Sequence, residues 1–316
     1  MKVYCLILPL LLLASALSGC HHKDLIDEAT PTGEQEIVFD WTEVPDANPS
    51  SMGAYLYGDT QEDVIRFMFS GRDGGPVKLP IDHYCGIAIN TDNASWLRMR
   101  NHKDADRFEL YTDGILSLPV SGYATRSVPQ PGNLNESMVS PPQMIWATRT
   151  DDLTVESLTE NKKLVFRMDE AVCHYTVDIL EVKNIKSLDG SGVDGTLSGM
   201  AAGWHPGRKR ASDTHATLPF ILKADKAAGT FHAEFLTFGE NPNHSYPHSL
   251  TVYLILKDGS KRYYTFDVAD QITSAADPRH VHIVVRGLDL PDSVSGDGGL
   301  NPDVNDWEEE DIDISM

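Results

Sequence analysis

Short runs of β-branched, aromatic and aliphatic residues, each closed by turn residues, constrain this fold more than any other feature. In the run 64–69, Ile65, Phe67 and Phe69 form an apolar face, and the alternate residues form a mixed one. This alternation predicts a strand with one face in a core. No long segment has an apolar period of about 3.6 residues, so we expect only short helices, such as one at 268–273. The other strand-like runs are 37–41, 53–57, 84–89, 164–168, 173–182, 231–238 and 280–286.

The clearest supersecondary signal is a hairpin at residues 249–268. A continuous β-type run at 250–256 is followed by a turn at 257–260 that contains Gly259, and a second run returns at 262–268. Glycine tolerates the positive φ that such turns require. Regular short strands with turns between them predict an all-β fold built from β-sandwiches. The length of 316 residues suits two domains, although one large all-β domain also fits.

Composition divides the chain into five predicted segments. A polar stretch with Pro31 and Gly33 has no apolar period and is typical of a flexible tether. Residues 127–142 are rich in Pro, Ser, Gly and Asn and resemble a linker, but 144–147 could be one more strand of the first domain. We therefore place the domain boundary near residue 157. The predicted segments are a signal peptide at 1–19, a tether at 20–35, an N-terminal β-sandwich at 36–157, a C-terminal β-sandwich at 158–290 and an acidic tail at 291–316.

The first twenty residues have the pattern of an export signal. Lys2 precedes an apolar run at 6–17, and small residues follow. The run is shorter than the roughly 20 residues that span a bilayer. The cysteine after Leu-Ser-Gly resembles the lipobox of bacterial lipoproteins, which implies cleavage between Gly19 and Cys20 and acylation of Cys20. The alternative is an ordinary secretory signal that adjoins a cysteine; in both cases the mature chain lies outside the cytoplasm.

The net charge of the chain narrows the classes of partner that it can bind. The formal net charge of −21 disfavours binding to nucleic acid and to anionic lipid headgroups, so membrane attachment must come from acyl chains.

Cys5 leaves with the signal and Cys20 carries lipid, which leaves Cys85 and Cys173 in strand-like runs. Two cysteines are no disulfide framework. They are either buried free thiols or one bridge between the two halves.

The sequence holds no recognisable catalytic motif. It has no Gly-x-Ser-x-Gly elbow, no His-Glu-x-x-His pair and no glycine-rich phosphate loop, so we predict no enzyme activity, no metal site and no cofactor. Trp204 lies in a predicted loop with Arg208, Lys209 and Arg210, the one basic cluster of an acidic protein. This loop suits contact with an acidic partner or a glycan, although a solvated loop needs no function.

The acidic tail contains a second candidate for partner binding. Ile312, Ile314 and Met316 alternate with polar residues a few positions after Trp307. One interpretation is a solvated, disordered tail. The other is a short strand that adds to the edge of a sheet, with Trp307, Ile312, Ile314 and Met316 as its contacts.

Seven short stretches, spread over nearly the whole mature chain, carry a family resemblance. They are CHHKDL at 20–25, VFDW at 38–41, VPDANP at 44–49, GTLSGM at 195–200, FLTFG at 235–239, YYTFDV at 263–268 and D-x-x-D-W at 303–307. Together they resemble the fimbrillin-like (Mfa-like) lipoproteins, the fimbrial subunit and anchor group of Bacteroides-type bacteria. The resemblance implies two transthyretin-like β-sandwich domains in tandem, a place on the outer membrane within or at the base of a fimbria, and assembly by donation of a strand between subunits.

One departure from the family pattern distinguishes this chain from a shaft subunit. The resemblance implies that polymerising members lose their first strand when a protease cuts after an N-terminal arginine. Here no lysine or arginine lies between Lys23 and Arg66, and Arg66 falls inside a predicted strand. We therefore predict a non-catalytic anchor or accessory adhesin, lipid-anchored on the outer membrane at the cell surface, with fimbrial subunits as partners. The alternative is a glycan-binding lipoprotein of a polysaccharide uptake system, which an exposed, coplanar tryptophan pair would favour.

Overall fold

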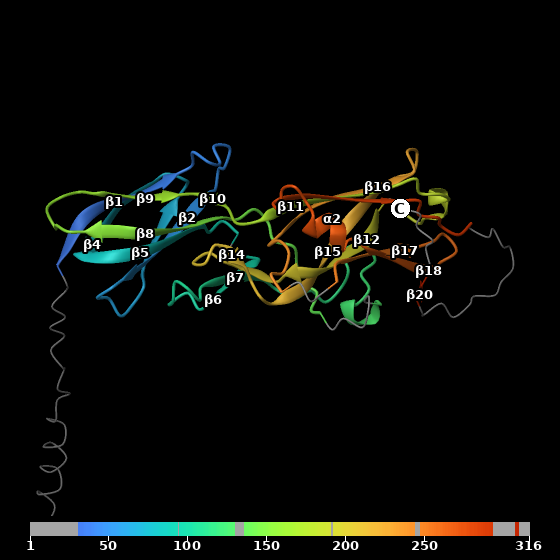
Figure 1. Ribbon diagram of the computed structural model, residues 1–316, viewed down its shortest axis with the longest axis horizontal. Coiled ribbons are helices and arrows are strands. Elements are labelled where there is room, and N and C mark those ends of the chain that lie inside the picture. The colour runs from blue at the N-terminus through green and yellow to red at the C-terminus, as the bar shows by residue number, and fades with distance from the viewer. Residues whose placement is uncertain are drawn as a thin grey trace, which may run out of the picture.

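The fold is all-β, as predicted, with sandwich-like packing of several sheets. The computed structural model describes residues 31–93, 95–129, 136–190, 192–243, 247–292 and 307–309. Figure 1 shows an elongated molecule, with the strands of the N-terminal half at one end and those of the C-terminal half at the other. Every run predicted as a strand overlaps an observed strand, and the expected short helix is α2 (Ala269–Thr273).

Two sheets face each other in the N-terminal half. The three-stranded sheet has the order β4-β1-β9, and β1 pairs antiparallel with β4 and parallel with β9. The five-stranded sheet has the order β10-β8-β5-β2-β3. The bounds are β1 Thr32–Asp40, β2 Ser51–Gly58, β3 Ile65–Ser70, β4 Gly74–Pro80, β5 Asp82–Asn90, β8 Trp146–Val155, β9 Lys163–Arg167 and β10 Asp169–Glu170.

Alternation of apolar residues explains how these sheets meet. Ile65, Phe67 and Phe69 of β3 turn toward a core that contains Ile37 and Phe166, whereas Arg66 and Met68 are exposed. The opposite face of the five-stranded sheet is also covered, because Tyr55, Ile87 and Ile89 pack in a second cluster with Phe108 and Phe238. The buried apolar faces fix the register of these strands, because a slip by one residue would turn their apolar side chains to the opposite face.

The C-terminal half is one large sheet that folds over its own core. Its strand order is β19-β11-β16-β15-β12-β17-β18-β20. Strands β15 and β16 pair only between residues 223–225 and 230–232, and beyond that point Phe220 and Phe235 stack with ring centroids 4.2 Å apart. The two parts of the sheet therefore enclose one apolar core. The bounds are β11 Cys173–Leu180, β12 Gly192–Ala201, β15 His215–Asp225, β16 Thr230–Thr237, β17 Ser249–Ile255, β18 Lys261–Asp267, β19 His280–Arg286 and β20 Glu308–Glu309.

A small four-stranded sheet joins the two halves. Its order is β14-β13-β7-β6, so it combines strands β6 (Leu97–Arg100) and β7 (Glu109–Thr112) with β13 (Gly203–His205) and β14 (Arg210–Ala211). Figure 1 places β7 and β14 between the two ends of the molecule. Segments about 90 residues apart in the sequence thus form one unit at the junction.

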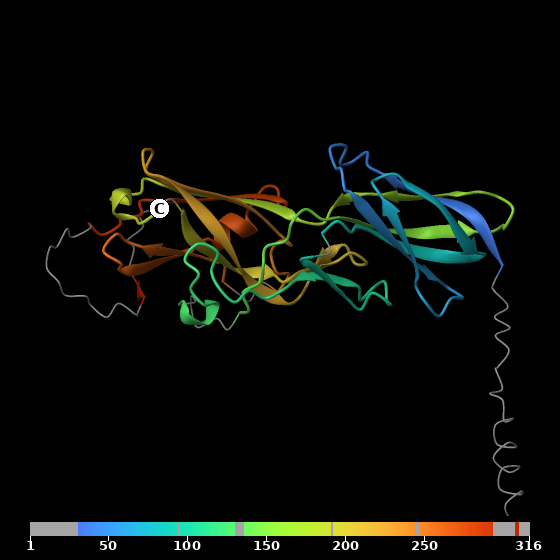
Figure 2. The same ribbon diagram turned by 180° about the vertical axis from the view of Figure 1, so that it is seen from behind.

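The segment that follows β7 packs on the C-terminal half. Figure 2 shows this segment, which includes the 3₁₀ turn Thr125–Ser127, beside the C-terminal strands. The buried Asp194 of β12 accepts hydrogen bonds from the backbone N–H groups of Val120 and Ser121, at 2.7 and 2.8 Å. Farther along, Met138 is buried and bridges to Thr217 of β15. Residues 136–142, part of the stretch whose composition resembles a linker, therefore pack against the C-terminal half; residues 130–135 lie outside the described part.

The pairing of β9 and β10 bears on the domain boundary. Both strands follow residue 157, yet β9 pairs with β1 and β10 pairs with β8. We therefore propose that the N-terminal unit extends to Glu170 and that the C-terminal unit begins with β11.

Candidate functional site

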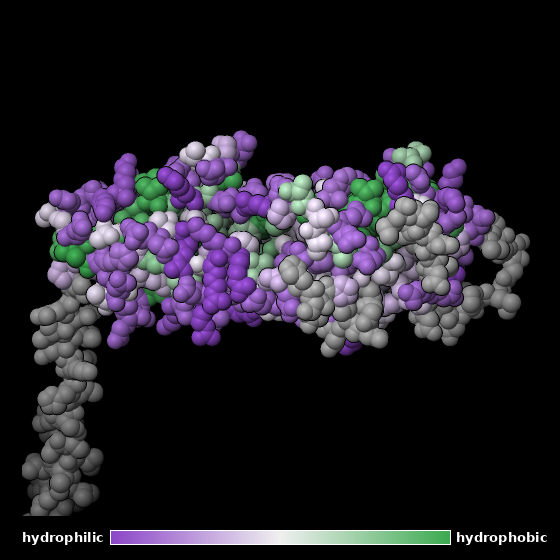
Figure 3. All heavy atoms as spheres, in the orientation of Figure 1, coloured by the Kyte–Doolittle hydropathy of each residue, from purple (hydrophilic) through white to green (hydrophobic). Residues whose placement is uncertain are grey.

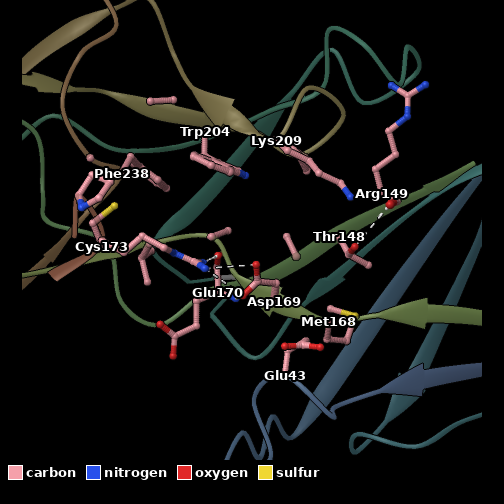
Figure 4. A pocket seen from close by; sticks show the side chains of 18 of the residues that line it. Glu43, Thr148, Arg149, Met168, Asp169, Glu170, Cys173, Trp204, Lys209 and Phe238 are labelled. Atoms are coloured by element: carbon pink, nitrogen blue, oxygen red, sulfur yellow. Dashed lines mark hydrogen bonds and ion pairs between the residues drawn. The ribbon is translucent and has the colours of Figure 1, made fainter. Parts of the chain in front are cut away.

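A cavity of about 1040 Å³ opens at the junction of the two halves. Figure 4 shows Trp204 and Lys209 on one side of it and Asp169 and Glu170 on the opposite side. Its apolar end contains the side chains of Cys173 and Phe238. The volume is just above the range of about 300–1,000 Å³ that is typical of small-molecule sites.

The β13–β14 hairpin positions Trp204. Within the shared sheet, Trp204 pairs with Ala211 on one side and with Leu110 of β7 on the other. The hairpin tip also touches the turn at 101–107, because a Cβ atom on Gly207 would lie 1.7 Å from the carbonyl oxygen of Ala105. Only glycine permits this approach, which sets the height of the hairpin above the cavity.

Arg149 of β8 holds the same hairpin tip by a hydrogen bond. Its guanidinium donates to the carbonyl oxygen of Gly207 at 2.8 Å and pairs with Asp106 and Asp151. Burial opposes the charge of Arg149, but the two carboxylates outweigh it and raise the pKa above its ordinary value. Arg149 is thus a permanent cation that holds the hairpin and the turn at 101–107 together.

A buried carboxylate fastens the shared sheet. The Glu109 side chain receives a bidentate contact from Arg100 at 2.6 and 2.7 Å, and the Ser212 hydroxyl donates to it at 2.9 Å. Burial on its own raises the pKa of Glu109, but these hydrogen bonds outweigh it and hold the pKa below its ordinary value. The network therefore joins β6 and β7 to the residues after β14, which stabilises the wall that carries Trp204.

The opposite wall is built from β10 and the loop before β19. Arg279 pairs with Asp169 at 3.2 Å and donates to the backbone oxygen of Glu170. Glu170 also pairs with His174 at 3.0 Å. Each ionised carboxylate accepts about four hydrogen bonds, so both keep acceptor capacity toward the cavity.

The predicted basic cluster is divided by the structure. Trp204 and Lys209 line the cavity, whereas Arg208 is exposed and lies outside its lining. Arg210 makes a bidentate pair with Asp213 at 2.8 Å. Within the described part of the chain, neither the side-chain ammonium of Lys209 nor the indole N–H of Trp204 has a hydrogen bond or ion pair, although the backbone N–H of Lys209 donates to the Pro206 carbonyl oxygen. These two donors are therefore available to a ligand.

The other predicted sites have different outcomes. Trp307 packs edge-to-face on Tyr123 and Tyr253, with centroids 5.5 and 5.4 Å away. Cys85 and Cys173 are free and partly exposed, and burial raises the pKa of each thiol to about 11. Gly19, Cys20, Ile312, Ile314 and Met316 lie outside the described residues.

Sequence reasoning missed the wall formed by Asp169, Glu170 and Arg279. The acidic pair after the predicted strand at 164–168 was a weak signal, and Arg279 had none, since only the fold brings it there. Among the described residues, no cluster of three or more His, Cys, Asp or Glu side chains could hold a metal ion. The same residues include no helix long and apolar enough to cross a membrane.

These features define an all-β protein with two sandwich-like halves and a cavity where they join. The chain belongs to the DUF5119 family, described as a domain of unknown function, whose model matches residues 19–221.

Two relatives extend this family assignment. The chain is 22% identical to a Bacteroides ovatus protein provisionally named fimbrium anchoring subunit Fim4B, over 96% of each chain. It also resembles the crystal structure of a B. ovatus protein that is provisionally described as an adhesin. The TM-score is 0.62 and the identity 20%, over 87% of this chain and 99% of that one. The Porphyromonas gingivalis fimbrial anchor protein Mfa2 overlaps with a TM-score of 0.49 at 10% identity, over 80% of this chain and 90% of that one.

The predicted resemblance to the fimbrial subunit and anchor group is confirmed by this relationship to Fim4B. The similar proteins are described as an anchoring subunit and an adhesin, and neither description is that of an enzyme. The likeness to the crystal structure extends over both halves and shows that the fold is shared.

Proposed function

We propose that this chain is a non-catalytic fimbrial subunit that acts as an anchor or accessory adhesin on the outer membrane. The observation that carries this proposal is the match to Fim4B over 96% of both chains. Acylation of Cys20 would hold the protein in the membrane, since two acyl chains are enough for stable anchoring. The face drawn in Figure 3 is mostly hydrophilic, with hydrophobic side chains in separate patches, which agrees with a folded part that stands clear of the lipid.

The position of the first strand supports an anchor over a shaft subunit. Strand β1 lies between β4 and β9 in its sheet, and its residues Ile37 and Phe39 are buried in the core. Arg66, the first basic residue after the tether, lies within β3. Cleavage at Arg66 would need local unfolding of that strand. Loss of β1 by proteolysis is therefore disfavoured, and the lipidated end stays attached to the fold.

The sheet edges support joining to neighbours by strand addition. The edge of β19 is blocked at Val284, whose N–H and carbonyl oxygen both bond to the Gln271 side chain at 2.8 and 3.0 Å. Strand β3 pairs only with β2, and in the described residues no other hydrogen bond reaches its outer edge. An open strand edge is a template for another strand, so β3 is the better acceptor.

The root of the acidic tail is fixed to its own chain. Strand β20 pairs with β18, and Glu308 forms an ion pair with Arg262 at 2.6 Å. Because Trp307 packs on Tyr123 and Tyr253, residues 307–309 attach the base of the tail to its own chain and are not free to pair with a neighbouring subunit. We therefore assign the donor role to Ile312, Ile314 and Met316, which share one face when the chain is extended.

No coplanar pair of tryptophans among the described residues supports the alternative of a polysaccharide uptake protein. Trp41 and Trp146 are neighbours, but their rings are inclined at 84° and do not form a flat platform. Trp307 packs edge-to-face against tyrosines. Within the described residues, no ring contact joins two tryptophans in one plane. We therefore retain the fimbrial subunit as the proposed function.

The test is recovery of the lipidated chain from its native outer membrane, with partners identified by mass spectrometry. We expect fimbrial subunits to copurify. The triple variant Ile312→Ser, Ile314→Ser, Met316→Ser should lose them, because it removes the apolar face of the proposed donor strand.

The matched control keeps that face and removes only charge. It combines Glu310→Gln, Asp311→Asn and Asp313→Asn, and we expect it to retain the fimbrial subunits. Copurification of a polysaccharide importer in place of fimbrial subunits would refute the proposal. Equal recovery of partners by both variants would remove the tail from the mechanism.

A further inference from the structure

We propose that the junction cavity binds a short neutral saccharide, with Trp204 as its stacking surface and Lys209 as its main hydrogen-bond donor. This site goes beyond the proposed function, because the cavity belongs to the fold whether or not the chain enters a fimbria.

The two open donors lie together on one wall. The Trp204 ring borders the cavity with its nitrogen on the side of Lys209 (Figure 4). Lys209 adopts a left-handed backbone conformation with φ of 50°, at the end of the hairpin turn. Non-glycine residues rarely adopt this conformation. In this conformation the side chain of Lys209 lines the cavity, whereas the side chain of its neighbour Arg208 does not. An aromatic face beside two donors suits the C–H face and hydroxyl oxygens of a sugar.

The charges of the cavity disfavour an anionic ligand. The lining includes five carboxylates, of Asp40, Glu43, Asp169, Glu170 and Glu240. The lining arginines are already paired: Arg149 with Asp106, Arg167 with Asp40 and Arg279 with Asp169. Lys209 is thus the one lining cation that has no ion pair among the described residues. Sugar hydroxyls both donate and accept, so a neutral saccharide can use Lys209 on one wall and the carboxylates on the other.

The main chain at the cavity disfavours an added peptide strand. Strand β10 is an edge strand, but its backbone groups are occupied by neighbours. The Glu170 N–H bonds to the Asp169 side chain, its carbonyl oxygen accepts from Arg279, and the Ala171 N–H bonds to Ile145. An extended peptide gains affinity from main-chain hydrogen bonds that this edge cannot offer. The cavity must therefore recognise its ligand through side chains, which suits a compact polyol better than an extended peptide.

The experiment uses the full chain purified in detergent and a panel of trisaccharides. The neutral probes are maltotriose, mannotriose and triacetylchitotriose, and sialyllactose is the acidic probe. Binding is measured by calorimetry and saturation-transfer NMR. We expect at least one neutral probe to bind, with sialyllactose weaker by about tenfold or more. Trp204→Ala should weaken binding about tenfold, whereas Trp204→Phe, which keeps an aromatic face, should lose less than about threefold.

The matched pair Lys209→Met and Arg208→Met separates the site from the charge of the loop. Both variants remove one cation from adjacent residues, and both residues are exposed, so both should fold. We expect about a fivefold loss for Lys209→Met and no change for Arg208→Met.

The proposal is overturned if no neutral trisaccharide binds at millimolar concentration, if sialyllactose binds best, or if both methionine variants bind equally. Recovery of fimbrial subunits by the same variants tests the proposed function separately. If Trp204→Ala and Lys209→Met lose those subunits and the native chain binds no sugar, the cavity docks a neighbouring protein and the saccharide site is refuted.

Discussion

Replacing Gly207 with alanine tests whether the close approach of the hairpin tip holds the cavity wall in place. The added Cβ atom would lie 1.7 Å from the carbonyl oxygen of Ala105, with a second backbone atom of Ala105 at 2.7 Å. Both obstacles are backbone atoms, so no side chain can turn aside to make room. The tip and the turn at 101–107 must therefore separate by more than about 1 Å, given ordinary contact distances.

That separation has two energetic costs. Forcing an extra carbon into a packed site costs about 1–3 kcal/mol. The movement also stretches the 2.8 Å hydrogen bond from Arg149 to the Gly207 carbonyl, and a bond to a charged group contributes about 1.5–3 kcal/mol. Because the bond is weakened and not abolished, we expect a total loss of about 2–4 kcal/mol in the free energy of unfolding.

The assay is urea unfolding followed by tryptophan fluorescence, combined with amide hydrogen exchange of residues 203–211. The matched control is Gly114→Ala, because a Cβ atom there meets only the Met138 carbonyl oxygen at 3.6 Å. That control should be neutral or more stable by about 0.4–1 kcal/mol, through a less flexible unfolded chain. If Gly207→Ala is as stable as Gly114→Ala and exchanges no faster in the hairpin, the close approach does not hold the wall.

Three further predictions concern other parts of the molecule. The pKa of Glu109 is lowered by folding, so its charge stabilises the fold at neutral pH and that contribution is lost as the pH falls through the lowered pKa; Glu109→Gln should cost about 1–3 kcal/mol at pH 7 and less near pH 3, measured by urea unfolding at both. Cys85 and Cys173, with pKa values raised to about 11, should stay unpaired and react slowly with iodoacetamide at pH 8, and a mass two hydrogens lower would contradict this. Trp307→Ala removes two ring contacts at the tail root, so limited proteolysis should release the tail faster than from the native chain.

The strands were predictable from the sequence because their signals are local. The alternation of Ile65, Phe67 and Phe69 needs only neighbouring residues, and the hairpin of β17 and β18 has its turn between two clear runs. The parallel pairing of β1 with β9 joins residues more than 120 positions apart, and no local pattern encodes it. The packing of residues 136–142 has no local signal either, because proline and serine indicate an irregular path and not whether that path is packed.

The candidate site was half predictable. An aromatic residue in the one basic loop singled out Trp204 and Lys209, but it could not separate Lys209 from Arg208 and Arg210. That separation depends on the hairpin turn, in which Lys209 takes a positive φ, and on Asp213, which binds Arg210. Which of three adjacent cations faces a cavity is a property of turn geometry, and side-chain type does not reveal it.

The cavity depends on how the two halves sit together. One wall of the cavity belongs to the shared sheet, where β7 pairs with β13. The other wall is formed by β10 and Arg279, and it lies where the chain passes from β10 to β11 through residues 171–172. A ligand that touches both walls binds only when this arrangement is intact, so it stabilises the junction by an amount set by its concentration relative to its Kd. Linkage makes the effect reciprocal, so a load that separates the walls must weaken the ligand by the same coupling free energy. A fimbrial subunit under tension would therefore hold its saccharide less tightly than the same chain at rest, unless the shared sheet carries the load and keeps the walls fixed.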